Sequence, residues 1–240
     1  MPVLVASELF FGNLSRRQNE LQIVCSKSET YKNRHHLRDD LMYKYEKDVM
    51  PDSIDGNAVN VSIGVDLLRI IDMDNQILTL DTVITEIWQA DNLKWRPGHV
   101  GGLEEIRLPS DLIWKPDLAL ADGAGKTVFI KSEDTNVIIN SSGFVSWYPP
   151  VKTKTFCSYG ELQNGDEIEC HLTLYSWTHS TSTLDLKLQA DEMDTSNLDV
   201  DFNPHWKLVS THADVKHKVY SCCPESYAQA SFTFRLRYVA

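Results

Sequence analysis

The stretch Ala230-Ser-Phe-Thr-Phe-Arg-Leu-Arg-Tyr238 decides the fold, because apolar and polar residues alternate along its whole length. A period of two places the apolar side chains on one face of an extended chain and the polar side chains on the other. Such one-sided burial is typical of antiparallel sheets. The stretch therefore predicts a half-buried β-strand in an all-β protein.

The same alternation recurs at other places in the chain. It is clear in Val59–Leu67, where the phase breaks at Leu68 and predicts a β-bulge. Shorter alternating stretches are Leu172–Leu174 and Leu184–Leu188. Internal repeats and long Gly/Ser linkers are absent from the sequence, so we interpret its 240 residues as one sandwich-sized domain.

One helix is predicted, from Arg34 to Val49, and Pro51 is expected to end it. Its apolar residues share one face because they occupy every fourth position: Leu37, Leu41, Tyr45 and Val49. The remainder of the chain is predicted to be strand or loop.

Charge indicates the kind of ligand to expect. A net charge of −11 argues against binding to nucleic acids or anionic membranes and favours a cationic partner. The sequence lacks the roughly 18 consecutive apolar residues that a membrane-spanning helix needs. The N-terminus lacks a basic region and is interrupted by Glu8, so we expect that any signal peptide has been removed.

The cysteines and glycosylation sequons indicate an oxidising, extracellular compartment. The five cysteines are Cys25, Cys157, Cys170, Cys222 and Cys223. Their spacing is not typical of zinc, so neither a metal nor a cofactor is expected. Three sequons are candidate glycosylation sites, beginning at Asn13, Asn60 and Asn140. Cys25 could be free or could join another chain.

Cys222 and Cys223 are adjacent and lie between Tyr220 and Tyr227. Consecutive Cα atoms lie about 3.8 Å apart, less than the roughly 4.4–6.8 Å usual for a disulfide, so a bond between them would be strained. Spacing alone leaves open that the two thiols bind different partners or a metal. The two flanking aromatic rings favour a clamp for a cation at a hairpin tip.

Several motifs occur together and in a fixed order along the chain. They are Trp114-Lys-Pro-Asp117, Asn140-Ser-Ser-Gly143, Pro149-Pro150, the pair Cys157 and Cys170, Ser176-Trp-Thr-His179, and the stretch from Tyr220 to Tyr227. In this order they resemble the extracellular ligand-binding domains of Cys-loop receptors, and above all the soluble acetylcholine-binding proteins of that family. The resemblance implies an N-terminal extension over residues 1–30 and one ligand-binding domain over residues 31–240.

The resemblance also implies an architecture and a site. The fold would be an immunoglobulin-like twisted β-sandwich with an N-terminal α-helix, assembled as a ring-shaped homopentamer with ligand at each interface. The implied disulfides are Cys157–Cys170 and Cys222–Cys223. The principal face of each site would consist of Trp177, Tyr220, Cys222, Cys223 and Tyr227. The neighbouring subunit would add a complementary face of Trp88, Ile138, Ser146 and Tyr148.

Two departures from the family pattern affect this site. Two residues after Trp88, where the family usually has an aspartate, this chain has Ala90. The alternative interpretation of Trp88 is a structural one, a tryptophan half-buried in a strand. Ala121 stands where the family has a tyrosine that forms one wall of the aromatic cage. The cage could be open there, the segment could be displaced by one residue, or another aromatic such as Trp147 or Tyr148 could fill the gap. A lost aromatic contact costs about 0.5–2 kcal/mol of binding free energy.

The implied function is that of a secreted, soluble protein that binds acetylcholine, nicotine and similar ammonium ligands and catalyses no reaction. The segment between Cys157 and Cys170 favours the soluble form, because residues 158–169 are polar, whereas receptors have an apolar segment that packs on the membrane domain. The chain also stops after Tyr238-Val-Ala, where a receptor would enter its first membrane helix. The alternative is an extracellular fragment of a channel subunit.

Other function classes have less support. The sequence lacks the nucleophile-elbow, phosphate-loop and His-Glu-x-x-His motifs of enzymes. Four side chains could be considered as an acid–base catalytic cluster, but we expect them to be solvated on the polar face of the helix: His35, His36, Asp39 and Asp40. A carbohydrate-binding sandwich would fit the six tryptophans and nine tyrosines but would not explain the adjacent cysteines. The acidic run from Asp191 to Asp201 is interpreted as a solvated loop or as an acidic lip on a cation site.

Overall fold

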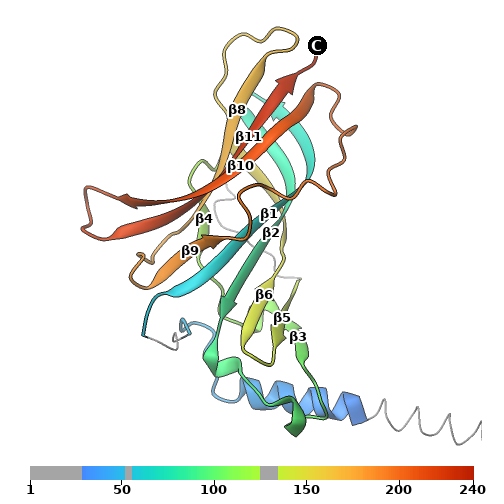
Figure 1. The fold of residues 1–240 in the computed structure, drawn as a ribbon, viewed down its shortest axis with the longest axis vertical. Helices are drawn as coiled ribbons and strands as arrows, with labels where there is room; N and C mark the ends of the chain where they lie inside the picture. Colours follow the sequence, from blue (N-terminus) through green and yellow to red (C-terminus); the bar gives the residue numbers. More distant parts are fainter. Residues whose placement is uncertain (1–28, 52–55, 125–134) are drawn as a thin grey trace, which may run out of the picture.

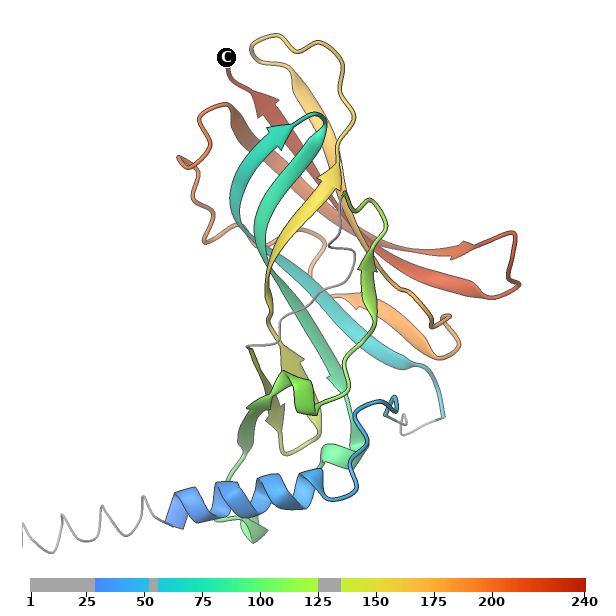
Figure 2. The ribbon, with the colours of Figure 1, turned by 180° about the vertical axis from the view of Figure 1, so that it is seen from behind.

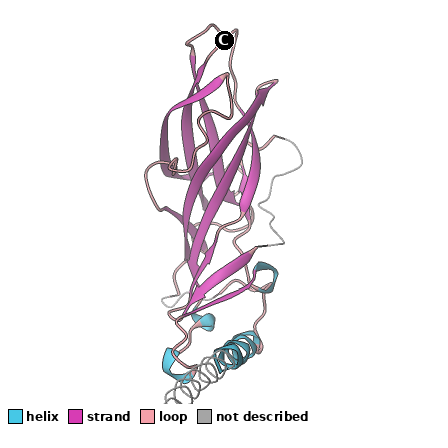
Figure 3. Cartoon of the chain, turned by 90° about the vertical axis from the view of Figure 1, so that its right-hand side faces the viewer, coloured by secondary structure: helices cyan, strands magenta, loops and turns pink. Residues whose placement is uncertain are grey.

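Strand residues alternate between interior and surface throughout the structure, a computed structural model that describes residues 29–51, 56–124 and 135–240. Two β-sheets pack against each other around one hydrophobic core, and a helix over residues 29–42 lies across one end (Figure 1). The C-terminus lies at the opposite end of the molecule, as the side view in Figure 3 also shows. The prediction of a β-sandwich with an N-terminal helix is confirmed, whereas the ring of five stays a prediction.

The described residues form one larger and one smaller sheet. The larger sheet has the order β3-β5-β6-β2-β1-β9, and β7 also pairs with β2. Its strands are β1 (Val59–Asp74), β2 (Ile77–Gln89), β3 (Glu105–Pro109), β5 (Asn136–Asn140), β6 (Phe144–Trp147), β7 (Pro150–Phe156) and β9 (Leu184–Leu188). The smaller sheet has the order β10-β11-β8-β4. Its strands are β4 (Leu118–Leu120), β8 (Glu167–Ser176), β10 (Trp206–Val219) and β11 (Ser226–Tyr238). Three short 3-10 helices lie between β2 and β4: η1 (Asp91–Leu93), η2 (Pro97–His99) and η3 (Ser110–Leu112).

Strand β11 confirms the alternation that predicted the fold. Phe232 and Phe234 are each 1% exposed, and β11 is paired on both sides, with β10 and with β8. Burial of a side chain of this kind stabilises the fold by about 1.5–3 kcal/mol. Because one face of β11 is fixed in the core, Thr233, between these phenylalanines, is held on the outer face of the smaller sheet.

The predicted bulge in β1 is also confirmed. The register between β1 and β2 shifts between Leu67 and Arg69, and it shifts again between Ile70 and Asp72. An extra residue on one strand increases the local twist and bends the strand. Strands β1 and β2 accordingly curve together toward the end of the molecule where the C-terminus lies (Figure 2).

The helix ends earlier than the sequence predicted. Leu37 and Leu41 are buried as expected, but the helix stops at residue 42 and Val49 is 63% exposed. The prediction of helix up to Val49 is wrong because Lys44 has a φ of 61°, the left-handed conformation that commonly ends helices. Tyr45 nevertheless contributes to the packing, since its hydroxyl accepts a hydrogen bond of 3.0 Å from the backbone N–H of Trp114.

The polar face of the helix is solvated, as expected. His35 and Asp39 form a pair of 3.2 Å between side chains that are 54% and 51% exposed. Exposed ion pairs contribute little to the free energy of unfolding. Because both side chains are about half exposed, this pair does not form an enclosed acid–base site.

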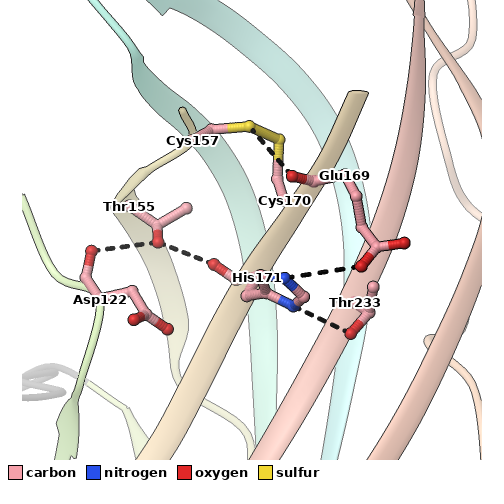
Figure 4. The surroundings of a disulfide bond; sticks show 7 residues. All are labelled: Asp122, Thr155, Cys157, Glu169, Cys170, His171 and Thr233. Atoms are coloured by element: carbon pink, nitrogen blue, oxygen red, sulfur yellow. Dashed lines mark hydrogen bonds and ion pairs between the residues drawn. A yellow bond between two sulfur atoms is a disulfide. The ribbon is translucent and has the colours of Figure 1, made fainter. Parts of the chain in front are cut away.

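The predicted Cys157–Cys170 disulfide is present and joins the end of β7 to β8. Figure 4 shows the polar contacts beside it, where the Thr155 hydroxyl lies 2.7 Å from the carbonyl oxygen of His171 and 3.1 Å from that of Asp122. Both cysteines are buried, whereas most of the segment between them is exposed. The bridge therefore closes a polar loop beside the C-terminal end of the chain.

Replacing both Cys157 and Cys170 with serine should lower the free energy of unfolding by about 3 kcal/mol, because the unfolded chain regains the entropy of an open loop. Urea unfolding at one fixed protein concentration measures this change. Ser158→Ala, inside the same loop, is the matched control and should leave the midpoint in place. An unchanged midpoint in the double variant would show that the bridge contributes no stability.

Candidate functional site

The hairpin formed by β10 and β11 projects from the body of the sandwich and ends in the tyrosine-flanked cysteines (Figure 1). Tyr220 and Tyr227 come from opposite arms of this hairpin. Their ring centroids lie 5.7 Å apart in an edge-on arrangement. The Cys223 N–H donates to the Tyr220 carbonyl at 3.1 Å and closes the tip. The two tyrosine rings that flank the cysteines therefore lie beside each other at the hairpin tip, whereas their role as a clamp for a cation stays a prediction.

Cys222 and Cys223 are free thiols in this structure, the first exposed and the second half-buried. The Cys222–Cys223 disulfide expected from the resemblance is therefore not formed here. Consecutive Cα atoms lie closer together than in most disulfides, so a bond between these two thiols would be strained. Hydrogen bonding to Cys222 raises the pKa of the Cys223 thiol and so favours its protonated form. The oxidised pair stays a prediction.

Trp177 lies on the surface, with 56% of the residue exposed. Asp117, the last residue of the Trp-Lys-Pro-Asp motif, fixes the backbone on both sides of it. The Asp117 carboxylate accepts hydrogen bonds from the Ser176 hydroxyl at 2.5 Å and from the Thr178 N–H at 2.8 Å. Its backbone carbonyl accepts one from the Trp177 N–H at 3.1 Å. The indole is thus held at the surface by a fixed loop.

The loop that follows Trp177 is bonded to the tyrosine hairpin. The Thr181 N–H donates to the Ser226 carbonyl at 2.8 Å, and the hydroxyl groups of these two residues lie 2.5 Å apart. Ser226 directly precedes Tyr227. Two segments separated by some 45 residues in sequence are therefore joined at the place where the predicted principal-face residues lie.

Sequence reasoning missed Tyr175, which lies two residues before Trp177 on β8. The two rings lie 6.0 Å apart, inclined by 46°. Gln229, the register partner of Tyr175 on β11, donates from Nε2 to the Tyr220 hydroxyl at 2.9 Å. The available signal was the two-residue spacing, which places both rings on one face of a strand. We call Tyr175, Trp177, Tyr220 and Tyr227 the aromatic cluster.

One ring of the aromatic cluster is in contact with a positively charged side chain of the protein itself. Lys218, on β10, places its Nζ atom 5.0 Å from the centroid of the Tyr220 ring. A cation within about 6 Å of a ring centroid is attracted by the negative face of the π-system. Tyr220 is therefore oriented so that an ammonium group can approach its ring.

Three of the four predicted complementary-face residues lie together on the outer side of the larger sheet. Ile138 on β5 and Ser146 on β6 are register partners, and both are partly exposed. Tyr148 follows two residues after Ser146 and is 43% exposed. Ile87 on β2, which the sequence analysis did not select, pairs with Ser146 and extends the same row.

The fourth residue, Trp88, lies elsewhere, and its prediction as a complementary-face residue is wrong. It is 1% exposed and packs edge-on against Trp114 at 5.9 Å inside its own sandwich. Because neighbouring residues of a strand point to opposite faces, Ile87 faces outward and Trp88 faces the core. Trp147 is also 1% exposed, so it does not fill the space beside Ala121.

The candidate glycosylation residues that the structure describes are exposed. Asn60 lies on β1, and the side-chain oxygen of Asn140 accepts hydrogen bonds of 3.0 Å from the N–H groups of Ser142 and Phe144. Asn140 therefore shapes the β5–β6 turn, whether or not it carries a glycan. Asn13 and Cys25 lie outside the described residues. Among those that are described, no cluster of three His, Cys, Asp or Glu side chains is arranged to hold a metal.

Comparison with known proteins gives one consistent result. Residues 34–238 match the family model described as the neurotransmitter-gated ion-channel ligand binding domain. The chain is 35% identical over 201 residues to the neuronal acetylcholine receptor subunit alpha-10 of Homo sapiens, which covers 82% of this chain and 44% of the relative. It is 34% identical over 207 residues to the neuronal acetylcholine receptor subunit alpha-9-II of Oncorhynchus mykiss, and the match covers 84% of this chain and 36% of the relative.

A third relative, the acetylcholine receptor subunit alpha of Danio rerio, is 32% identical over 218 residues, covering 89% of this chain and 46% of the relative. The chain thus spans less than half the length of these receptor subunits. Within residues 29–51, 56–124 and 135–240, no helix is both long enough and apolar enough to cross a membrane.

Proposed function

We propose a function from one premise, that this chain belongs to the family of neurotransmitter-gated ion-channel ligand-binding domains. The protein binds acetylcholine and other quaternary or protonated amines outside the cell, as a soluble protein. The observation that carries this proposal is the exposed Trp177, whose ring lies 6.0 Å from that of Tyr175, while Gln229, the register partner of Tyr175, is hydrogen-bonded to Tyr220.

The binding mechanism is a cation–π contact without covalent chemistry. An ammonium group over the Trp177 face meets the negative side of the indole, with Tyr220 and Tyr227 beside it. Closing the hairpin over the ligand would exclude water and strengthen the attraction between the charge and the rings. Such closure is a population shift that the ligand drives by binding the closed state more tightly.

A second copy of the chain is needed to complete the site. The aromatic cluster faces outward from the smaller sheet, whereas Ile138, Ser146 and Tyr148 face outward from the larger one. The core lies between these two outer faces, so one chain cannot place both around a single ligand. A homopentameric ring would bring the first face of each subunit against the second face of its neighbour.

The polar segment 158–169 supports a soluble protein over a channel fragment. Most of its residues are exposed, and a segment of this composition is a poor partner for an apolar membrane domain. The receptor alternative rests on the likeness to longer receptor subunits. A transcript that continues beyond residue 240 into apolar segments would decide for the receptor.

The function is tested by titrating the purified protein with acetylcholine, nicotine and a simple sugar while tryptophan emission and mass in solution are measured. We expect a saturable emission change with the two amines and a mass of five times the 27.4 kDa chain. A monomer whose emission responds only to the sugar would replace this proposal with a carbohydrate-binding one.

A further inference from the structure

One flank of the aromatic cluster lacks the ring expected there. Ala121 is exposed and follows β4, and its N–H donates to the Thr173 carbonyl on β8 at 2.8 Å. This bond keeps the backbone in line with β8 beyond the last residue of β4. The alanine at position 121 therefore lies opposite Thr173 of β8.

Tyr175 lies on β8 between Trp177 and this flank. Its register partner on β4 is Ala119, two residues before Ala121. Diagonal neighbours on paired strands lie about 7–8 Å apart, within reach of an aromatic side chain. Ala119 on β4 and Ala121 just after it both have only a methyl side chain, so neither competes with the Tyr175 ring for the space on this side.

The orientation of Tyr175 joins it to the rest of the cluster. Leu174 and Ser176 are buried, so Tyr175 points to the outer face of β8, and Trp177 is exposed directly after the end of this strand. Their ring centroids lie 6.0 Å apart, and Gln229, opposite Tyr175, is hydrogen-bonded to Tyr220. Burial, followed by the proximity of Tyr220, raises the pKa of the Tyr175 hydroxyl above its ordinary value.

We infer that Tyr175 supplies the aromatic wall that this chain lacks at Ala121 and that it contacts the ammonium ligand beside Trp177. This inference rests on the proposed function and adds a binding residue to it. The ligand class is a quaternary ammonium whose methyl groups lie against the ring. Because the contact depends on charge, Tyr175 should increase the preference for a charged ligand over a neutral one of the same shape.

The test compares Tyr175→Phe with Tyr175→Leu. Both variants lack the hydroxyl and both are apolar, so they differ in the presence of a π-face. Calorimetry measures binding of acetylcholine and of its neutral tert-butyl analogue, in which a carbon replaces the charged nitrogen. We expect the leucine variant to bind acetylcholine at least about threefold more weakly than the phenylalanine variant, with no such loss for the neutral analogue.

Tyr43→Phe and Tyr43→Leu form the control pair, since Tyr43 is 73% exposed just beyond the helix at the other end of the molecule, and these two should bind alike. Thermal unfolding confirms that each variant is folded. Equal acetylcholine affinity in the two Tyr175 variants, or an equal loss for both ligands, would overturn the inference. Wild-type protein that binds no acetylcholine would instead overturn the proposed function, so the two failures are distinguishable.

Discussion

Trp177→Ala should weaken acetylcholine binding by about thirtyfold or more. A desolvated contact between an ammonium group and an indole is worth about 2 kcal/mol or more, and each 1.4 kcal/mol is a factor of ten in affinity. The Asp117 bonds reach Ser176, Thr178 and the backbone of Trp177, so they remain when the indole is removed. The loss is therefore expected in binding and not in folding.

Calorimetry is the suitable measurement, because removing a tryptophan changes the emission signal itself. Trp177→Phe keeps a smaller π-face and should lose less affinity than Trp177→Ala. Phe202→Ala removes another exposed ring, 48% exposed in the loop before β10, and should bind normally. An alanine variant at position 177 that binds acetylcholine as tightly as wild type would exclude Trp177 from the site.

Glu86→Gln should stabilise the protein at alkaline pH, by up to about 5 kcal/mol above pH 8. Glu86 is fully buried on β2, and neither carboxylate oxygen has a hydrogen-bond partner among the described residues. Burial raises its pKa from 4.5 to about 8, and the charge of Lys115 offsets part of that effect. The folded protein therefore favours the neutral acid.

The sign of the pH dependence follows from these two pKa values. Between about pH 4.5 and pH 8 the folded state binds a proton that the unfolded state has released, so wild-type stability falls as the pH rises through this window. Glutamine resembles the neutral acid in shape and does not titrate, so the contribution of this position to the slope should disappear. Below pH 4.5 the two proteins should be similarly stable.

Urea unfolding from pH 4 to pH 9 at fixed protein concentration measures this difference. Glu161→Gln makes the same chemical change at an exposed carboxylate and is the matched control. We expect it to give no comparable gain in the free energy of unfolding at pH 9. Parallel stability curves for wild type and Glu86→Gln would contradict a buried, neutral Glu86.

Periodicity predicted the parts of the fold that depend on alternating burial. The β11 phenylalanines and the β1 bulge are where the pattern placed them, because a strand with one buried face has only one acceptable register. The end of the helix was not predictable in this way. Its apolar spacing continues to Val49, but the left-handed backbone at Lys44 depends on how the next segment packs.

The candidate site was predicted less completely than the fold. Trp88 was assigned to the complementary face by its likeness to a family motif, whereas the alternation of side chains along β2 directs Trp88 to the core and Ile87 outward. Tyr175 was missed because an aromatic residue in an alternating strand can equally belong to the core, although its two-residue spacing from Trp177 was a signal. The bonds from Asp117 join segments distant in sequence and required the tertiary structure.

The most direct test of the cation–π account is the affinity of the wild-type protein for acetylcholine compared with its neutral tert-butyl analogue, measured by calorimetry under the same conditions. The two molecules have nearly the same shape and differ in the positive charge. The account predicts that acetylcholine binds at least about tenfold more tightly. Equal affinities for the two would contradict it.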